Sequence, residues 1–267
     1  KAILLKTNGK RCSQLKQKNQ AIIATITDPT TKDIIKFNII NEHTLWRAKT
    51  MFSKEPITIK WIRSFKKNST FFDIGANVGI YSIFAGIINS SKVYSFEPES
   101  NNYQVLMQNI IINNLSELVI PFQIGISDKT ELTNLNLNNF AAGLSHHTVG
   151  ENALDHSSLK PIASKYKQGV FSTTLDDLCS TWKFETPTYI KIDVDGIENK
   201  IISKSINVLS SKLLKSVLIE INENREEDKQ IIKTMKSLKF QYDHSQVNEA
   251  RRKSGPHEGY AEYLFYR

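Results

Sequence analysis

Cysteine is scarce in this chain of 267 residues, which contains only Cys12 and Cys179. Two cysteines exclude the disulfide framework that holds many small secreted domains together. They also exclude a zinc site built from four cysteines. We therefore expect a protein of a reducing compartment, the cytoplasm.

Long apolar runs are also absent, since no stretch approaches the roughly 18 consecutive apolar residues that a membrane-spanning helix requires. We therefore expect no membrane span. Hydrophobic residues make up 40% and charged residues 23% of the chain, which excludes a collagen-like or wholly disordered protein. A chain of this length and composition can form one large domain, or a domain with a modest extension.

Acidic residues are outnumbered, because 27 Asp and Glu face 35 Lys and Arg, and the formal net charge is +8. This excess is compatible with nucleic acid, a membrane surface or an anionic substrate as a partner. Most of the cations are lysines spread along the chain. That distribution favours a general compositional bias, so we expect no specific nucleic-acid partner.

Apolar runs alternate with segments of helical periodicity from residue 70 onward. Short β-branched or aromatic runs predict strands, and apolar residues three or four positions apart predict the helices between them. This alternation indicates a doubly wound α/β fold with a mostly parallel sheet of seven strands. The predicted strands are Phe71–Ile74, Lys92–Phe96, Leu118–Ile126, Thr188–Val194, Ser216–Ile221, Phe240–Tyr242 and Tyr260–Tyr266.

The first part of the chain has a different pattern. Two β-branched runs, Ala21–Thr27 and Ile34–Ile40, flank a turn-rich segment and predict a hairpin. A partly helical stretch, Leu45–Phe65, follows it. We expect an N-terminal extension over residues 1–68 and the main α/β domain over residues 69–267.

One long segment within the main domain, residues 129–172, has weak periodicity and contains His146, His147 and His156. A loop of this length in a compact domain is usually functional or disordered. We expect it to be a loop that covers the binding cleft.

The turn Asp73-Ile-Gly-Ala-Asn-Val-Gly79 connects the first strand of this domain to its first helix. Open α/β sheets bind ligands at this position, beyond the carboxyl ends of their strands. The dinucleotide fingerprint G-x-G-x-x-G is absent, because its central glycine is missing. A ligand without phosphates fits better, and the carboxylate of Asp73 suits a cationic amine. S-adenosylmethionine has an amine, a sulfonium and no phosphate, so we expect it as the cofactor. Its expected contacts in this turn are Asp73, Gly75, Asn77 and Gly79.

Two further strand ends carry candidate cofactor contacts. Glu97 follows the second predicted strand, where a carboxylate can accept hydrogen bonds from both ribose hydroxyls. Pro98 beside it can pack on the adenine ring. At the end of the third strand, Ile126 and Ser127 are expected near the adenine, with a plain hairpin turn as the alternative for that segment.

The segment Lys191-Ile-Asp-Val-Asp-Gly-Ile-Glu198 ends the fourth predicted strand. The alternation of side chains along a strand places Lys191 and Asp193 on the same face. We expect Asp193 to face the cleft and to contact the cofactor near its methyl group. Enzymes that methylate amino groups of nucleobases usually have an Asn/Asp-Pro-Pro-aromatic turn here, and this chain has none. Methylation of carbon 5 of cytosine requires a cysteine nucleophile, and neither cysteine is placed for that attack.

Five segments, in this order and spacing, resemble the FkbM-type methyltransferases. They are Phe72-Asp-Ile-Gly-Ala-Asn-Val-Gly79, Val93-Tyr-Ser-Phe-Glu-Pro98, Thr174-Leu-Asp-Asp-Leu178, Ile190-Lys-Ile-Asp-Val-Asp-Gly196 and Val217-Leu-Ile-Glu220. The family typically has Glu where this chain has Asp195, a difference that keeps the charge. The resemblance implies a class I, Rossmann-like methyltransferase that uses S-adenosylmethionine and most often methylates a hydroxyl oxygen.

Members of this family often act on sugars of surface polysaccharides, glycolipids or natural products, so we expect a small-molecule or glycan acceptor with a free hydroxyl. A hydroxyl has a high pKa, and a base must therefore remove its proton as the methyl group is transferred. We expect Asp193 to be this base. The other catalytic candidates are Lys191, His146 and His147.

Three alternatives accompany this interpretation. An RNA-directed methyltransferase would use the net charge and the triplet Arg251-Arg-Lys253. A metal-assisted reaction would use oxygen ligands from Asp193, Glu220 and Asn222, whereas we expect no metal. A non-enzymatic domain of the same fold is disfavoured because the candidate cofactor residues are intact.

Overall fold

The computed structural model describes residues 22–145, 147–151, 154–155, 160–255 and 257–267. Its main sheet has six strands in the order β14-β13-β12-β3-β4-β5. Five of them are parallel, and β14 pairs antiparallel with β13 at one edge. The strands are β3 (Thr70–Ile74), β4 (Lys92–Phe96), β5 (Val119–Phe122), β12 (Tyr189–Ile192), β13 (Ser216–Asn222) and β14 (Tyr260–Tyr266).

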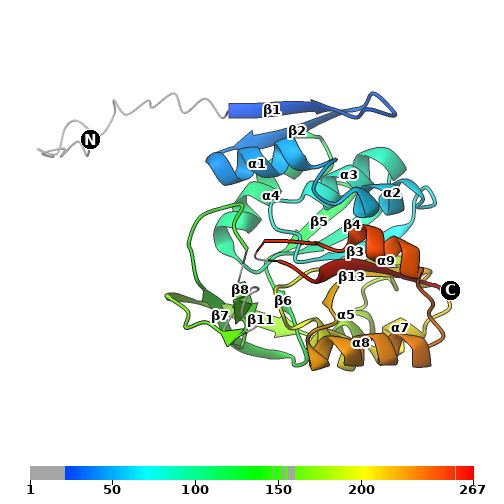
Figure 1. Ribbon diagram of the computed structural model, residues 1–267. Helices are drawn as coiled ribbons and strands as arrows, with labels where there is room; N and C mark the ends of the chain where they lie inside the picture. Colours follow the sequence, from blue (N-terminus) through cyan, green and yellow to red (C-terminus); the bar gives the residue numbers. More distant parts are fainter. Residues whose placement is uncertain (1–21, 146, 152–153, 156–159, 256) are drawn as a thin grey trace, which may run out of the picture.

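Helices cover both faces of this sheet (Figure 1). Successive side chains of a strand point to opposite faces, so Phe71 joins one hydrophobic cluster and Phe72 the other. The cluster of Phe71 contains residues of α2 (Pro56–Arg63), α3 (Ile80–Asn89) and α4 (Ser100–Ile112). The cluster of Phe72 contains residues of α5 (Leu175–Ser180), α6 (Glu198–Ser203), α7 (Ile206–Ser210), α8 (Glu226–Ser237) and α9 (His244–Ala250). The arrangement is the predicted doubly wound, Rossmann-like fold of class I methyltransferases.

The N-terminal hairpin is confirmed. Strands β1 (Ile22–Thr27) and β2 (Ile34–Ile39) pair antiparallel, and helices α1 (Glu42–Thr50) and α2 follow. The hairpin is attached to α4, because the side chains of Asn109 and Asn113 accept hydrogen bonds from the backbone of β2. Residues of the hairpin, α1 and α2 share one hydrophobic cluster with α3 and α4. The division of the chain at residue 68 stays a prediction.

The predicted count of seven strands is wrong for the main sheet. Phe240 is buried in the core, but only Gln241 reaches the sheet edge, where it forms a single antiparallel bridge with Tyr266. Helix α9 begins directly afterwards, with Asp243 as its N-cap residue, so no room remains for a strand. The predicted strand Leu118–Ile126 is divided as well, since β5 ends at Phe122 and the chain then enters a second sheet.

This second sheet occupies most of the segment that we expected to be a loop, residues 129–172. Its order is β6-β11-β7-β8, and it lies beside the main sheet in Figure 1. Its core is small, and buried polar residues such as Asn136 and Thr148 interrupt the apolar alternation, which explains the weak sequence signal. The strands are β6 (Gly125–Ile126), β7 (Glu131–Leu137), β8 (His147–Val149) and β11 (Tyr166–Thr173), with a separate short pair β9 (Leu154–Asp155) and β10 (Lys160–Pro161).

Among the described residues, no helix is long and apolar enough to cross a membrane.

Candidate active site

A cavity of about 300 Å³ opens at the carboxyl ends of β3, β4 and β12. This is the topological switch point of the sheet, where β3 has β4 on one side and β12 on the other. The wall combines residues of the main sheet, the N-terminal helix α1, the second sheet and the C-terminal segment. They include Trp46, Arg47, Lys54, Gly75, Asn77, Glu97, Pro98, Ile126, Leu144, His147, Asp193, Glu220 and Arg252.

Gly75 is required where β3 leaves the sheet. Its φ is +79°, and a Cβ atom placed on it would lie 1.8 Å from the carbonyl oxygen of Asp193. The absence of a side chain therefore allows the ends of β3 and β12 to come together below the cavity. Gly79 has a different role, because a Cβ atom there would lie 2.4 Å from a methyl carbon of Leu106 on α4. Gly79 lies outside the cavity wall.

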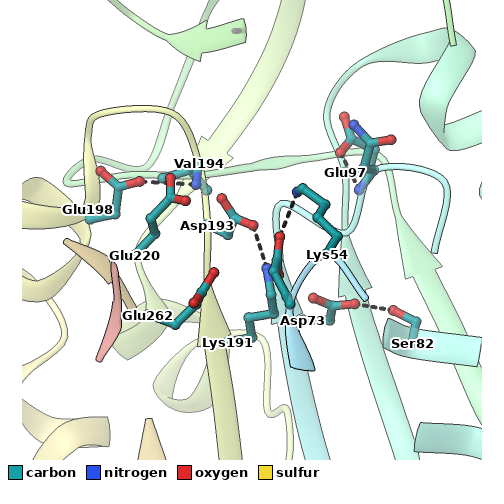
Figure 2. Close-up of polar contacts among 12 residues, drawn as sticks. Lys54, Asp73, Ser82, Glu97, Lys191, Asp193, Val194, Glu198, Glu220 and Glu262 are labelled. Atoms are coloured by element: carbon teal, nitrogen blue, oxygen red, sulfur yellow. Dashed lines mark hydrogen bonds and ion pairs between the residues drawn. The ribbon is translucent and has the colours of Figure 1, made fainter. Parts of the chain in front are cut away.

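The carboxylate of Glu97 is held rigidly in the cavity wall. Its two oxygens accept hydrogen bonds from the backbone N–H groups of Asn77 and Glu99, both at 2.8 Å. Burial raises the pKa of Glu97 to about 7, although these two N–H groups favour the ionised form. Figure 2 shows this carboxylate apart from the other acidic side chains of the site.

Asp73 is buried and lies outside the cavity wall. One of its carboxylate oxygens accepts a hydrogen bond from the hydroxyl of Ser82 at 2.5 Å (Figure 2). The hydroxyl of Ser82 in turn accepts a hydrogen bond from that of Ser95. Burial raises the pKa of Asp73, against the opposing effect of Lys191. The structure thus places Asp73 beneath the turn, between β3 and α3, and its contact with a cofactor amine stays a prediction.

Asp193 and Lys191 form an ion pair of 2.6 Å at the end of β12. Asp193 lines the cavity with a side chain that is 29% exposed, whereas that of Lys191 is 2% exposed. Burial lowers the pKa of Lys191, but the carboxylates of Asp193 and Glu55 outweigh it and hold this pKa above its ordinary value. Lys191 remains charged, therefore, and holds Asp193 in place. A pocket of about 30 Å³ beside the cavity is lined by both residues.

Three buried acids, Glu55, Glu220 and Glu262, lie near this pair. The sequence indicated Glu220 only as a metal ligand of one alternative, and it gave no role to the other two. Glu55 follows α1 and is held by Lys54 at 2.6 Å. Burial raises the pKa of Glu55, but the charges of Lys54 and Lys191 outweigh it and hold the pKa below its ordinary value. Glu220 and Glu262 lie opposite each other on β13 and β14.

Arg252 connects these acids. Its guanidinium lies 2.8 Å from Glu220, 3.4 Å from Glu262 and 4.0 Å from Glu55. Burial still raises the pKa of Glu220 to about 7 and that of Glu262 to about 8. The apolar and aromatic run of β14 contained the signal for Glu262, since a lone acid inside an apolar strand needs a buried partner.

The three ligands of the metal-assisted alternative have other contacts in the structure. Asp193 pairs with Lys191, Glu220 pairs with Arg252, and the side-chain oxygen of Asn222 accepts a hydrogen bond from the backbone of Asn224. Within the described ranges, no group of three His, Cys, Asp or Glu side chains is arranged to hold a metal ion.

The remaining sequence candidates divide between wall and interior. Pro98, Ile126 and His147 line the cavity. Ser127 is buried beside it and donates its hydroxyl hydrogen bond to Asp128. His146 and His156 lie outside the described residues.

The segment before β8 is fixed over the cavity by polar side chains. Asn77 donates a hydrogen bond to the carbonyl of Leu144 at 2.7 Å, and Asn102 accepts one from the N–H of Gly143 at 2.7 Å. The guanidinium Nε of Arg47 donates to the carbonyl of Gly143 at 2.6 Å. The second sheet and the N-terminal extension thus meet at the rim of the cavity.

Comparison with known proteins gives one family match. The model of the methyltransferase FkbM domain matches residues 73–242, more than half of the chain. A relative, the hexuronic acid methyltransferase AglP of Haloferax volcanii, is 20% identical over 187 residues, which are 70% of each chain.

Solved structures similar to this chain are distant in sequence. The precorrin-6y C5,15-methyltransferase of Geobacter metallireducens is 10% identical, with a TM-score of 0.44 over 79% of this chain and 86% of that one. TYW2 of P. horikoshii, in complex with MeSAdo, is 12% identical, with a TM-score of 0.46 over 91% and 69% of the two chains. The strand order described above establishes the fold class independently of these similarities.

Proposed function

The chain belongs to the FkbM methyltransferase family, and from this premise we propose that it transfers a methyl group to a hydroxyl oxygen of a sugar. It is a methyltransferase whose cofactor is S-adenosylmethionine. The similarity to a hexuronic acid methyltransferase supports a sugar acceptor. The observation that carries the proposal is the carboxylate of Asp193, which Lys191 holds in the wall of the cavity.

The residues of the cavity fit the cofactor. Glu97 offers a fixed carboxylate whose two oxygens each have a lone pair left for the ribose hydroxyls. Pro98 and Ile126 give apolar walls for the adenine, and Gly75 allows close approach of the backbone. The turn has no glycine-rich cradle for a pyrophosphate, which agrees with a cofactor that carries none. When bound, S-adenosylmethionine supplies a methyl group that its sulfonium has already activated.

The protein's own task is alignment and proton removal. The acceptor oxygen must be held about 3 Å from the methyl carbon and in line with the bond that breaks. In this proposal Asp193, which lines the cavity, accepts the hydrogen bond of the hydroxyl and then its proton. Lys191 acts on Asp193 as a positioning residue, since their contact fixes the direction of the carboxylate. His147, which also lines the cavity, is the second candidate for the base.

The proposal is tested with S-adenosylmethionine labelled with ¹³C in its methyl group and a set of simple glycosides. We expect new methyl ether signals in the product spectrum of at least one sugar, at an unchanged anomeric configuration. RNA treated in parallel should take up no label. Label transferred to a ring nitrogen or to RNA, with none on any sugar, would contradict the proposal.

A further inference from the structure

We propose that the outer end of the cavity is a subsite for an anionic sugar, in which Trp46 stacks on the pyranose ring and Arg47 binds its carboxylate. The inference rests on the proposed function and names the acceptor class more narrowly. Both residues are neighbours on α1, in the N-terminal extension, and both line the cavity.

Helix α1 is fixed so that these two side chains face the cavity. Asn41 and Thr44 form a reciprocal capping box at its start, and Thr44 and Ala48 are its buried residues. Trp46 and Arg47 lie between them and belong to the cavity wall. The helix therefore buries one side and presents the other to a ligand.

Trp46 is 49% exposed, although it lines a cavity. A large apolar ring left open to water in a concave site is a favourable surface for a ligand. The C–H groups on one face of a pyranose pack well on such a ring, and the hydroxyls at its edge remain free for polar contacts. The Nζ atom of Lys54 lies 6.0 Å from the centre of the ring, so a positive charge borders the same surface.

Among the described lysine and arginine residues that line the cavity, Arg47 is the one without an ion pair. Three carboxylates near the cavity already have cationic partners: Asp193 with Lys191, Glu220 with Arg252, and Glu55 with Lys54.

Arg47 makes no ion pair with any residue in the described part of the chain, and its Nε donates a hydrogen bond to the carbonyl of Gly143. This bond orients the guanidinium and leaves both Nη groups for a ligand. A guanidinium binds a carboxylate through two parallel hydrogen bonds, which a neutral hydroxyl cannot replace.

The subsite is formed before any acceptor binds. Gly143 has a φ of +86°, and a Cβ atom there would lie 3.0 Å from the backbone nitrogen of Thr44, so the segment before β8 lies directly against α1. Figure 1 shows the connection from β7 to β8 rising toward α1. Two parts of the chain that are distant in sequence thus close one rim, and little ordering is needed on binding.

The test compares methyl β-glucuronoside, methyl β-glucoside and glucose 6-phosphate as acceptors, with methylation kinetics and with calorimetric binding in the presence of S-adenosylhomocysteine. We expect the wild type to prefer the glucuronoside. Arg47→Gln should raise KM for the glucuronoside about tenfold more than it raises KM for the glucoside, because only the glucuronoside has a carboxylate for the guanidinium. Trp46→Ala should raise KM for both sugars about tenfold.

Matched controls come from the same chain. Lys49→Gln removes an equal charge from an exposed position of α1, and Trp182→Ala removes a tryptophan that is 51% exposed and is not in the cavity wall. Neither should alter KM. Arg47→Lys keeps the positive charge but lacks the two parallel N–H donors of the guanidinium. It should recover only part of the affinity for the glucuronoside, which separates loss of carboxylate binding from a fault in folding.

The outcomes separate the two proposals. Equal use of the glucuronoside and glucoside, with no change of their ratio in Arg47→Gln, overturns the subsite and leaves sugar methylation intact. Tighter binding of the phosphate than of the glucuronoside overturns the assignment of a carboxylate. If no sugar is methylated, the proposed function fails. Calorimetry still decides the subsite in that case. Glucuronoside binding that is lost in Arg47→Gln and kept in Lys49→Gln supports the subsite. Absence of glucuronoside binding to the wild type overturns it.

Discussion

At the residue scale, the reaction depends on how Asp193 is held. Its carboxylate lies between a buried cation, Lys191, and the open cavity, so one oxygen is fixed while the group remains accessible. The ring of Tyr81 covers the other side of Lys191, with Nζ 5.0 Å from the ring centre. A cation in this position limits the rotation of Asp193 without occupying the cavity.

Asp193→Asn should lower kcat by a factor on the order of 10² to 10⁴, because asparagine keeps the size and polarity of aspartate but cannot accept the proton. Cofactor affinity should change little by comparison. The measurement is the steady-state rate of methylation at saturating S-adenosylmethionine and acceptor. Asp33→Asn, at an exposed position of the hairpin turn, is the control. A kcat of Asp193→Asn within twofold of the control would transfer the role of base to another residue.

Glu97 should make cofactor binding depend on pH. Its pKa of about 7 in the free protein means that part of the population is protonated near neutrality. Ribose hydroxyls donate to the ionised carboxylate and favour it, so affinity should rise from about pH 6 to pH 8 and then level off.

Glu97→Gln should weaken binding tenfold or more at pH 8, since a charge-assisted bond contributes about 1.5–3 kcal/mol, and should remove the pH dependence. Calorimetry with S-adenosylhomocysteine measures both effects, with the exposed Glu117→Gln as control. Retention of the pH dependence in Glu97→Gln would place its origin elsewhere.

At the scale of elements, the turn after β3 lies directly against the end of β12, and Gly75 is the residue that permits this close approach. Gly75→Ala should destabilise the protein by about 2–5 kcal/mol, because a positive φ is costly for alanine and its Cβ atom overlaps the backbone of Asp193. Denaturation with guanidinium chloride measures the loss. Gly169→Ala in β11 is the matched control, since a Cβ atom there meets nothing within 4 Å. Equal stability of the two variants would contradict the close approach at Gly75.

The elements differ in how well the sequence predicts them. Strands β3, β4 and β12 are buried on both faces, and their continuous apolar runs, each ending in a polar segment, identify both the strands and the place of the cavity. Strand β7 has only its last three residues buried, one of them Asn136, so its pattern resembles a loop. Its stability comes from pairing with β11 and from contacts with the main domain, which no local pattern contains.

The candidate site shows the same division. Glu97 and Asp193 follow strands with strong signals and were expected in the cleft, where the structure has them. Glu55 has no such signal, because it stands between helices and gains its surroundings only when α2 packs near the end of β12. Asp73 illustrates the opposite case: its position at the strand end is as expected, but its side chain contacts Ser82 beneath the turn.

At the scale of the whole molecule, folding brings together more acids than cations in the interior around the site. Four buried glutamates have raised pKa values, mainly through burial: about 7 for Glu97 and Glu220, and about 8 for Glu198 and Glu262. Three of these residues, Glu198, Glu220 and Glu262, lie on the C-terminal half of the chain. The excess acid is tolerated because the native protein holds these groups largely protonated at mildly acidic pH.

This arrangement predicts that stability falls as the pH rises. Between about pH 4.5 and 8 the unfolded chain has released protons that the native state still binds. Each glutamate with a raised pKa therefore lowers the free energy of unfolding by about 1.4 kcal/mol per pH unit, until the pH reaches its native pKa. Asp28 and Glu55, whose pKa values are lowered, act in the opposite direction and only at more acidic pH. We therefore expect maximal stability near about pH 5.

Glu262→Gln isolates one of these groups. Glutamine cannot ionise, so the decline in stability between about pH 4.5 and 8 should be weaker than in the wild type, by up to about 1.4 kcal/mol per pH unit. Guanidinium denaturation at pH 5, 6, 7 and 8 measures the slope, and Glu131→Gln, an exposed glutamate on β7, should leave it unchanged. The same slope in Glu262→Gln and the wild type would mean that Arg252, 3.4 Å away, keeps Glu262 ionised in the native state. The acids around the site would then be stabilised by their cations, and the buried group would contribute no pH dependence to the fold.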